Sequence, residues 1–281
     1  MRKGAAQAAG LVLLGSLGVH SSSALMLGLF ASLGSGRASA MRLALAALLL
    51  VVIFRPRLRR RAPAEWLQIV LFGVSIAAMN AFVLLAIERI PFGVAVTINY
   101  LGPCAVAVLS SRGVREGGFA LLALLGVALA VGVTAPGDPA GLLFACLAAI
   151  GSAGYVLLAV RLGKRDDGPQ LIALAAVAAA AVHLPWLGAV HDVALPEWGL
   201  LLLAAAVGPA LASVVDITAG RLTSARVIGV LFSFGPVVGT LIGVIWLRQP
   251  LAFAAWLGIA LVVVAGAGIV LSARTGTPLS S

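Results

Sequence analysis

A short sequence pattern occurs once in each half of this chain, in the same order and at nearly the same spacing. The string LGP at 101–103 is followed by LGVAL at 125–129, and FGP at 234–236 is followed by LGIAL at 257–261. An offset of 132 to 133 positions superposes the two copies. Abundant Ala, Leu, Val and Gly make isolated matches easy by chance, but two Gly-Pro steps and two related strings at one offset favour an internal duplication.

The composition places both copies in a lipid bilayer. Of 281 residues, 62% are hydrophobic and only 10% are charged, and the mean hydropathy is +1.15. The apolar runs are about twenty residues long, which is the length of a membrane-spanning helix. Unsatisfied backbone groups in hydrocarbon cost several kcal/mol each, so such runs form helices. The expected spans are 7–29, 38–54, 66–87, 92–111, 118–135, 139–160, 170–189, 198–217, 226–246 and 252–272.

These spans predict an all-α integral membrane protein with ten transmembrane helices. The division lies at the Pro/Gly-rich stretch near residue 136, which gives two five-helix repeats, 1–136 and 137–281. Because each repeat has an odd number of spans, the second repeat crosses the bilayer in the opposite sense to the first. This inverted arrangement is typical of secondary transporters.

The formal charge of +10 reflects topology and not a nucleic-acid partner. With the spans above, most basic residues fall on the side that also holds both termini. They are Arg2, Lys3, Arg55, Arg57, Arg59, Arg60, Arg61, Arg112, Arg115, Arg161, Lys164, Arg165, Arg221, Arg226 and Arg274. The opposite side has only Arg37, Arg42, Arg89 and Arg248. By the positive-inside rule, both termini face the cytoplasm of a multi-pass inner-membrane protein.

Three strips of small residues recur at intervals of four and predict close helix packing. They are Gly235, Gly239 and Gly243; Gly126, Ala130 and Thr134; and Ala145, Ala149 and Ala153. Small residues at this spacing allow helix backbones to approach each other in a membrane.

Polar residues inside the apolar spans are the candidates for substrate binding, because they are costly in lipid unless they face a cavity or a partner. His20 and Ser21 lie past the middle of the first span. Serine hydroxyls can also bond to the preceding turn of their own helix, which is the alternative for Ser21. In the second copy the position equivalent to His20 is Ser152, and Tyr155, three residues later, shares the helical face of Ser152.

The two Gly-Pro steps are candidate hinges. Proline removes a backbone hydrogen bond inside a helix, so Gly102-Pro103 and Gly235-Pro236 should each kink their helix. The kink either serves as a hinge during transport or has a structural role only. Further candidate binding residues precede these steps. They are Asn99, Tyr100 and Ser233.

Three more polar residues complete the candidate site. Asn80 can donate and accept hydrogen bonds to a zwitterionic ligand. Asp216 is either an interfacial ion pair with nearby arginines or a gating or proton-coupling carboxylate. Arg42 either extends its side chain to the interface or attracts a substrate carboxylate.

The chain lacks the signatures of an enzyme. No Walker-type phosphate loop, no nucleophile, base and acid trio, and no cluster of metal-ligating residues is present in the sequence. We therefore expect no cofactor, no metal and no ATP hydrolysis by this chain. A membrane enzyme acting on lipid and a channel-like subunit are the alternatives. An enzyme would concentrate polar groups at one interface, and a channel would carry a continuous polar stripe, whereas the polar residues here gather at mid-depth.

Several segments resemble the EamA-type branch of the drug/metabolite transporter superfamily, and are most similar to bacterial threonine/homoserine exporters. The segments are 40–45, 72–75 with Met79-Asn80, 90–96 and above all 102–112. The resemblance implies a ten-helix, inverted-repeat carrier that exports small metabolites, commonly amino acids, with an ion gradient. We expect the chain to act as a monomer or a homodimer. Asn99-Tyr100-Leu101, with Pro250 and Trp256, is similar to aromatic amino acid exporters, so aromatic substrates stay open.

The chain departs from the family pattern at three places. Gly235 stands where the family usually has a glutamate before the proline, Arg248-Gln249 replaces a Gly-Glu pair, and Ser152 replaces a frequent tryptophan. From the residues and the resemblance together we expect export of a small zwitterionic metabolite by alternating access. A gradient of protons or of another ion would drive it, and Asp216 or His20 would be the group that carries a proton.

Overall fold

The computed structural model describes residues 2–58, 61–109, 114–132, 138–163, 165–188, 191–222 and 235–272, and these residues form helices and connecting segments with no strand. The first half contains α1 Arg2–Leu27, α2 Phe30–Leu33, α3 Ser35–Phe54, α4 Pro63–Ile87, α5 Phe92–Asn99, α6 Leu101–Leu109 and α7 Val114–Gly132. The second half contains α8 Pro139–Gly163, α9 Gly168–His183, η1 Leu184–Trp186, α10 Leu195–Ala205, η2 Ala206–Ala210, α11 Leu211–Leu222, α13 Gly235–Ile245 and α14 Phe253–Ser272.

The helices have the length and composition of membrane spans, which confirms an all-helical membrane protein. Six stretches of the described chain are long and apolar enough to cross a bilayer: Gly10–Leu27, Ser35–Phe54, Pro63–Ile87, Pro139–Ala159, Gly168–Trp186 and Leu195–Asp216. Shorter apolar helices occupy Phe92–Val106, Gly235–Ile245 and Phe253–Gly268. Many leucines on their outer faces are exposed, as a lipid-facing surface requires. The count of ten spans stays a prediction.

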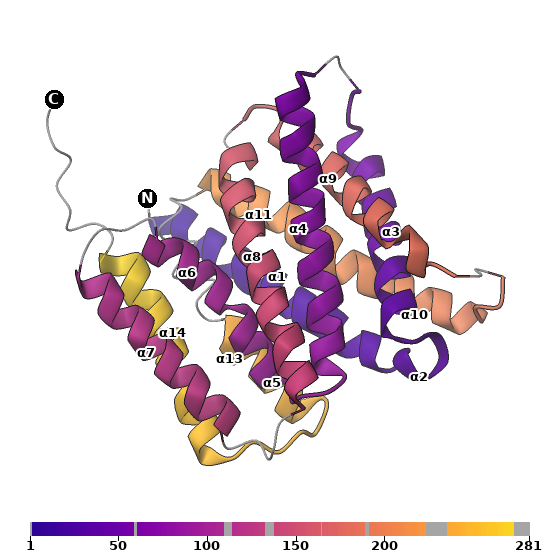
Figure 1. Cartoon of the computed structure of the whole chain (residues 1–281). Coiled ribbons are helices and arrows are strands. Elements are labelled where there is room, and N and C mark those ends of the chain that lie inside the picture. The colour runs from indigo at the N-terminus through magenta and orange to yellow at the C-terminus, as the bar shows by residue number, and fades with distance from the viewer. Residues whose placement is uncertain are drawn as a thin grey trace, which may run out of the picture.

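Helices of the first half pack mainly against helices of the second half. In Figure 1, α4 runs beside α8 and α9 through the bundle, and α7 lies beside α14 at its left edge. Further contacts of this kind join α1 to α11, α3 to α9, α5 to α13, α6 to α8 and α1 to α13. The buried core therefore lies between the two halves of the chain.

Two of these helix pairs, α5/α13 and α7/α14, are antiparallel, as the positions of their glycines reveal. On α13, Gly243 lies against Phe92, Gly239 against Val96 and Gly235 against Tyr100, so α13 runs opposite to α5. The predicted strip of small residues on α13 is thus confirmed as a packing surface for α5. The α7/α14 pair has the same sense, because a Cβ at Gly126 would meet Gly258 whereas one at Gly268 would meet Phe119.

Two helices are interrupted inside the bundle. The expected span 92–111 breaks at Tyr100, where α5 ends and α6 begins, two residues before Gly102-Pro103. The expected span 198–217 contains a five-residue π-helical segment, η2, with Pro209 inside it. Proline has no N–H to donate, and the wider π turn accommodates that loss. The break near the first Gly-Pro step was expected, but η2 was not.

Ion pairs tie the two halves together at both ends of the bundle. At one end, Arg61 bonds to Glu65 and, at 2.8 Å, to Asp167, and Arg165 bonds to Glu65 at 3.0 Å. At the other end, Arg37 pairs with Asp192, and Arg89 pairs with Asp138 at 2.7 Å. Asp138 also accepts a hydrogen bond from the Ala140 N–H, which caps α8.

The Arg61 and Asp167 pair predicts a pH-dependent contribution to stability. The hydrogen bond from Arg61 and the charge of Arg165 hold the pKa of Asp167 below its ordinary value. Its contribution is therefore complete above the ordinary aspartate pKa of about 4 and is lost as the pH falls through the lower folded-state pKa. We expect Asp167→Asn to lower the free energy of unfolding by about 0.5 to 1 kcal/mol at pH 7, and the difference from wild type to vanish at acidic pH.

Thermal unfolding in detergent between pH 7 and pH 3 measures this effect. Asp166→Asn is the matched control, because the neighbouring Asp166 is exposed and forms no ion pair with the described residues. Equal losses for the two variants at pH 7 would contradict the assignment.

Candidate functional site

The polar residues predicted for the site fall mainly into three clusters between the halves. We call them the Arg42 cluster, the aromatic cluster and the Asp216 pair. Each cluster joins elements that are far apart in the sequence, so none of them exists before the helices pack.

The Arg42 cluster places a buried guanidinium between α1, α3 and α4. The Arg42 side chain is about 2% exposed. Its Nη1 donates to Ser22 Oγ at 3.1 Å, and its Nη2 donates to Asn80 Oδ1 at 2.8 Å. Ser22 in turn donates to the Ala204 carbonyl at 2.6 Å, and Asn80 donates to the Ile76 carbonyl at 2.9 Å. Arg42 therefore does not extend to the interface, and its head is held inside the bundle.

A histidine and a serine extend this cluster toward α9. His183 is 4% exposed, and its Nδ1 lies 3.1 Å from the Ala179 carbonyl, a distance at which it donates. A neutral imidazole that donates through Nδ1 leaves Nε2 as an acceptor, and Ser39 Oγ lies 3.5 Å from it. The Arg42 guanidinium is within electrostatic range of this ring.

The aromatic cluster surrounds His20. This side chain is 5% exposed, and its ring lies edge-on to Phe92 at a centroid distance of 6.1 Å and next to Tyr100 at 6.2 Å. Gly235, the first residue of α13, closes the cluster: its backbone lies within hydrogen-bonding reach of His20. A Cβ at Gly235 would overlap the Tyr100 hydroxyl. Gly235 is therefore required for the close approach of α13 to the tyrosine ring.

The Asp216 pair joins α11 to α8. The Tyr155 hydroxyl donates to Asp216 Oδ2 at 3.5 Å, and the Tyr155 ring lies 5.3 Å from Phe72 on α4. Asp216 is also within electrostatic range of Tyr100, so the Asp216 pair is close to the aromatic cluster. No ion pair with a basic side chain is present for Asp216 in the described part of the chain.

Two predicted binding residues carry unsatisfied polar atoms inside the bundle. Asn99 Oδ1 and His20 Nε2 are buried and have no hydrogen-bond partner among the described residues. A buried acceptor without a partner is rare in folded proteins and calls for a water, an ion or a ligand. Ser152, which is 5% exposed on α8, adds a buried hydroxyl-bearing residue to the same interface.

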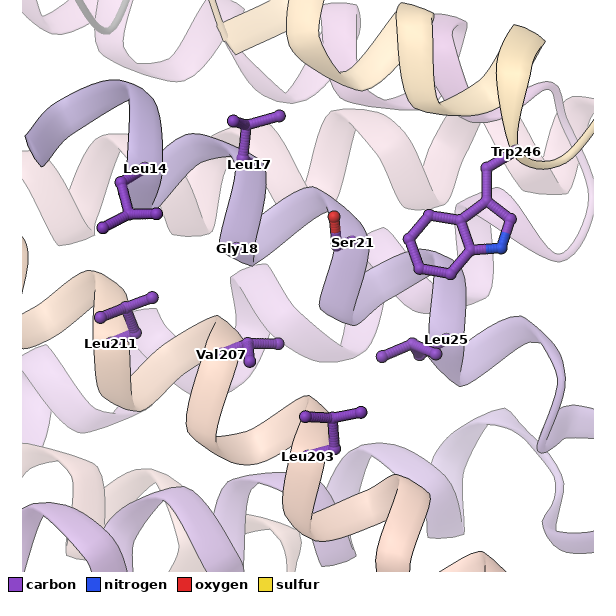
Figure 2. A pocket seen from close by; sticks show the side chains of 9 residues that line it. All are labelled: Leu14, Leu17, Gly18, Ser21, Leu25, Leu203, Val207, Leu211 and Trp246. Atoms are coloured by element: carbon purple, nitrogen blue, oxygen red, sulfur yellow. The ribbon is translucent and has the colours of Figure 1, made fainter. Parts of the chain in front are cut away.

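Ser21 lies apart from the three clusters. It lines an apolar groove between α1 and the α10 to α11 segment, where it is surrounded by leucines and by Trp246 (Figure 2). Ser23 donates to the Val19 carbonyl of its own helix at 3.1 Å, which is the kind of backbone bond considered above for Ser21. Ser233 lies outside the described residues, and so do the side chains of Arg221 and Arg226 that were considered as partners of Asp216.

Sequence reasoning did not select Ser22, Ser39 or His183 as site residues. Ser39 precedes Arg42 by one helical turn, a spacing that places the two side chains on one face. The spacing of Ser39 and Arg42 is therefore a signal from which Ser39 could have been predicted as a site residue. The pairing of Ser22 with α10 and of His183 with α3 depends on helix packing, and nothing in the local sequence indicates it.

The comparisons with known proteins agree with this architecture. The sequence pattern described as the EamA-like transporter family matches residues 139–271. The threonine/homoserine exporter RhtA of Salmonella typhimurium LT2 is 31% identical over 264 residues, which are 91% of this chain and 88% of that protein. The chain belongs to the EamA-like transporter family. A second relative, RhtA of Escherichia coli K12, is 29% identical over 272 residues, covering 94% of this chain and 91% of that protein.

A solved crystal structure has the same fold as this EamA-like protein. The two superpose with a TM-score of 0.61 over 97% of this chain and 99% of the other, at 20% sequence identity. At this identity the likeness concerns the fold alone. Together with the apolar helices, the family membership establishes a multi-pass membrane protein.

One departure from the EamA-like pattern has a structural counterpart. Arg248 has a φ of +54°, in the left-handed region that favours glycine, and the resemblance described above leads us to expect glycine at this position. Gln249 Oε1 accepts the Phe92 N–H at 2.9 Å, so it satisfies a free donor in the first turn of α5. A neutral amide therefore ties the end of α13 to α5 in this chain.

Proposed function

We propose that this EamA-like protein is a secondary transporter that exports a small amino acid across the bacterial inner membrane by alternating access. The observation that carries the proposal is the antiparallel pairing of α5 with α13 and of α7 with α14, together with the three polar clusters that lie between the two halves. The Arg42 cluster and the aromatic cluster contain residues of both 1–136 and 137–281, and Tyr155 of the Asp216 pair lies against Phe72 of the first half, as a site between two moving repeats requires.

We further propose that the two halves are inverted five-helix repeats and that both termini face the cytoplasm. The contact pattern supports this, because exchanging equivalent helices of the two halves leaves it nearly unchanged. By position in the repeats, α1 is equivalent to α8, α4 to α11 and α6 to α13. The contact of α1 with α11 therefore becomes that of α8 with α4 on exchange, and the contact of α6 with α8 becomes that of α13 with α1. Three further pairs, α3/α9, α5/α13 and α7/α14, each join two equivalent helices, so the exchange leaves each pair as it is.

The ends of the bundle support a carrier rather than an open channel. At both ends the ion pairs join the first half to the second, so a path to either side requires breaking one set of ties. Alternating access moves one repeat against the other and breaks these sets in turn. The break at Tyr100 and the Gly235-Pro236 step would be the hinges of that motion, together with Gly102 and Pro103.

The substrate class follows from the relatives and from the chemistry of the clusters. The curated relatives are named threonine/homoserine exporters. His20, Asn80, Asn99, Tyr100, Ser152, Tyr155, Ser21 and Ser233 would supply hydrogen bonds and ring contacts to a zwitterion. Asp216 would carry a proton, because a carboxylate inside a span is costly and is usually functional.

Uptake into inside-out vesicles or proteoliposomes tests the proposal. Labelled threonine, homoserine and phenylalanine are each supplied with and without an imposed proton gradient. We expect gradient-dependent uptake of at least one of the hydroxyl-bearing amino acids. Uptake of phenylalanine alone would move the substrate to the aromatic class, and uptake of none of them would overturn the function.

A further inference from the structure

Arg42 is a buried cation whose charge no described acidic side chain balances. The chain has nine acidic residues: Glu65, Glu88, Glu116, Asp138, Asp166, Asp167, Asp192, Glu197 and Asp216. All except Asp216 lie in the connecting segments or near the first turn of a helix, and Asp216 bonds to Tyr155. Arg42 forms no ion pair within the described part of the chain.

An arginine in such a position costs free energy unless a negative charge joins it. Burying an unpaired charge is unfavourable, and charged residues inside membrane helices pair with each other or face a pathway. The two groups that Arg42 does contact, a serine hydroxyl and an asparagine carbonyl, are neutral. They satisfy hydrogen bonds but do not balance the charge.

The hydrogen-bonding capacity of the guanidinium is also incompletely used. A guanidinium has five N–H donors in a planar fork, and Arg42 donates to the described residues with one bond from Nη1 and one from Nη2. Its buried Nε has no partner among the described residues. Nε and the adjacent Nη form the edge on which a carboxylate binds with two parallel hydrogen bonds.

The neighbours of Arg42 fix the orientation of this edge. Asn80 is itself held by the Ile76 carbonyl on α4, and Ser22 is held by the Ala204 carbonyl on α10. Gly208 lies directly against Ser22, where a Cβ would approach the Ser22 Cβ to 2.5 Å. The guanidinium is thus held by α1 and α4 of the first half, and Ser22 is in turn held by the second half, so a movement between the halves changes the surroundings of the guanidinium.

We propose that Arg42 binds the carboxylate of the transported amino acid and makes a free carboxylate a requirement for binding. This assignment rests on the proposed function, because it names the residue that recognises one end of the substrate. It goes further in predicting which derivatives are refused. Neutral carboxyl derivatives of similar size, such as the amide, would leave the charge unbalanced.

Ligand-induced thermal stabilisation of the purified protein in detergent tests the assignment. The concentrations of threonine and of threoninamide that give half-maximal stabilisation are compared, because this ratio does not depend on the amount of folded protein. For the wild type we expect threonine to act at a concentration at least about tenfold below that of the amide. Equal concentrations for acid and amide would overturn the assignment.

Arg42→Gln removes the charge and should abolish the preference, leaving acid and amide within about threefold of each other. Arg37→Gln is the matched control, because Arg37 lies on the same helix but pairs with Asp192 at its end, and it should keep the wild-type ratio. An unchanged ratio in Arg42→Gln would mean that the arginine is structural, and would overturn the proposal.

Asn80→Asp provides a test that keeps Arg42 in place. It puts a carboxylate at the position that now accepts from Nη2 at 2.8 Å, so the protein supplies its own counterion. We expect the folded protein to persist and the preference for threonine over threoninamide to fall by at least about tenfold. A preserved preference would contradict carboxylate binding at Arg42.

The wild-type measurements distinguish a failure of the proposed function from a failure of the Arg42 assignment alone. If threonine, homoserine and phenylalanine all fail to stabilise the wild type or to be transported, the proposed function fails and the Arg42 assignment fails with it. If threonine is transported and the ratio for Arg42→Gln is that of the wild type, only the Arg42 assignment fails.

Discussion

Gly102→Ala should destabilise the protein strongly, although it adds a single methyl group. A Cβ at Gly102 would overlap the carbonyl oxygen of Ala149 on α8 and lie 2.9 Å from the Ala153 nitrogen. Both are backbone atoms, so no side chain can move aside, and α6 or α8 must shift. Overpacking in a close-packed interior costs about 1 to 3 kcal/mol, and a clash with backbone belongs at the upper end. We therefore expect a large drop in the thermal unfolding temperature in detergent.

Gly199→Ala is the control for this prediction. Gly199 lies in α10, and a Cβ there would meet nothing within 4 Å. Because alanine is a better helix former than glycine by about 1 kcal/mol, this variant should be neutral or stabilising. Equal unfolding temperatures for the two variants would mean that α6 does not pack on α8 as closely as the structure has it.

The role of Gly102 illustrates what a sequence can and cannot predict. The Gly-Pro step predicts an interrupted helix, and the chain does break at Tyr100, close to that step. The sequence also makes Gly102 part of a candidate hinge. In the structure Gly102 is helical, and the absence of a Cβ serves the contact with α8. The spacing of residues indicates that a small residue is needed, but only the partner helix explains why.

The helical class and the small-residue packing surfaces could be predicted because they are local properties. Hydrophobic runs determine the membrane helices, and small residues at intervals of four determine a face. The strip on α13 indeed packs against Val96 and Phe92 of α5. The π-helical segment η2 could not be predicted, since Pro209 allows either a kink or a wider turn, and packing of neighbouring helices decides between them.

The candidate site was predictable in its residue types but not in its groupings. Arg42, Asn80 and His20 stand out as polar residues in apolar helices. Their partners depend on which helices meet: Arg42 finds Ser22 and Asn80, whereas Asn80 and His20 lie in separate clusters. The sequence offset between the repeats identifies which residues are equivalent, but it does not predict which residues of the two halves contact each other.

Asp216→Asn should abolish gradient-driven transport while leaving substrate exchange intact. Asp216 lies in the interior of α11, at the end of the apolar stretch Leu195–Asp216, and the Tyr155 hydroxyl donates to it at 3.5 Å. It has no basic partner among the described side chains, so its charged form is costly and a proton is the simplest compensating charge. Asparagine preserves the size of the side chain and its ability to accept from Tyr155, but it cannot carry the proton.

Accumulation of threonine in proteoliposomes with an imposed proton gradient measures gradient-driven transport. Counterflow of labelled against unlabelled threonine measures substrate exchange. We expect accumulation by Asp216→Asn to fall at least about tenfold and counterflow to stay within about threefold of wild type, because only the net movement of charge requires the carboxylate. Tyr155→Phe removes the donor but keeps Asp216, so it should retain coupled accumulation at a reduced rate. Wild-type accumulation by Asp216→Asn would show that the coupling ion binds elsewhere, and His20, buried beside Tyr100, would be the next group to substitute.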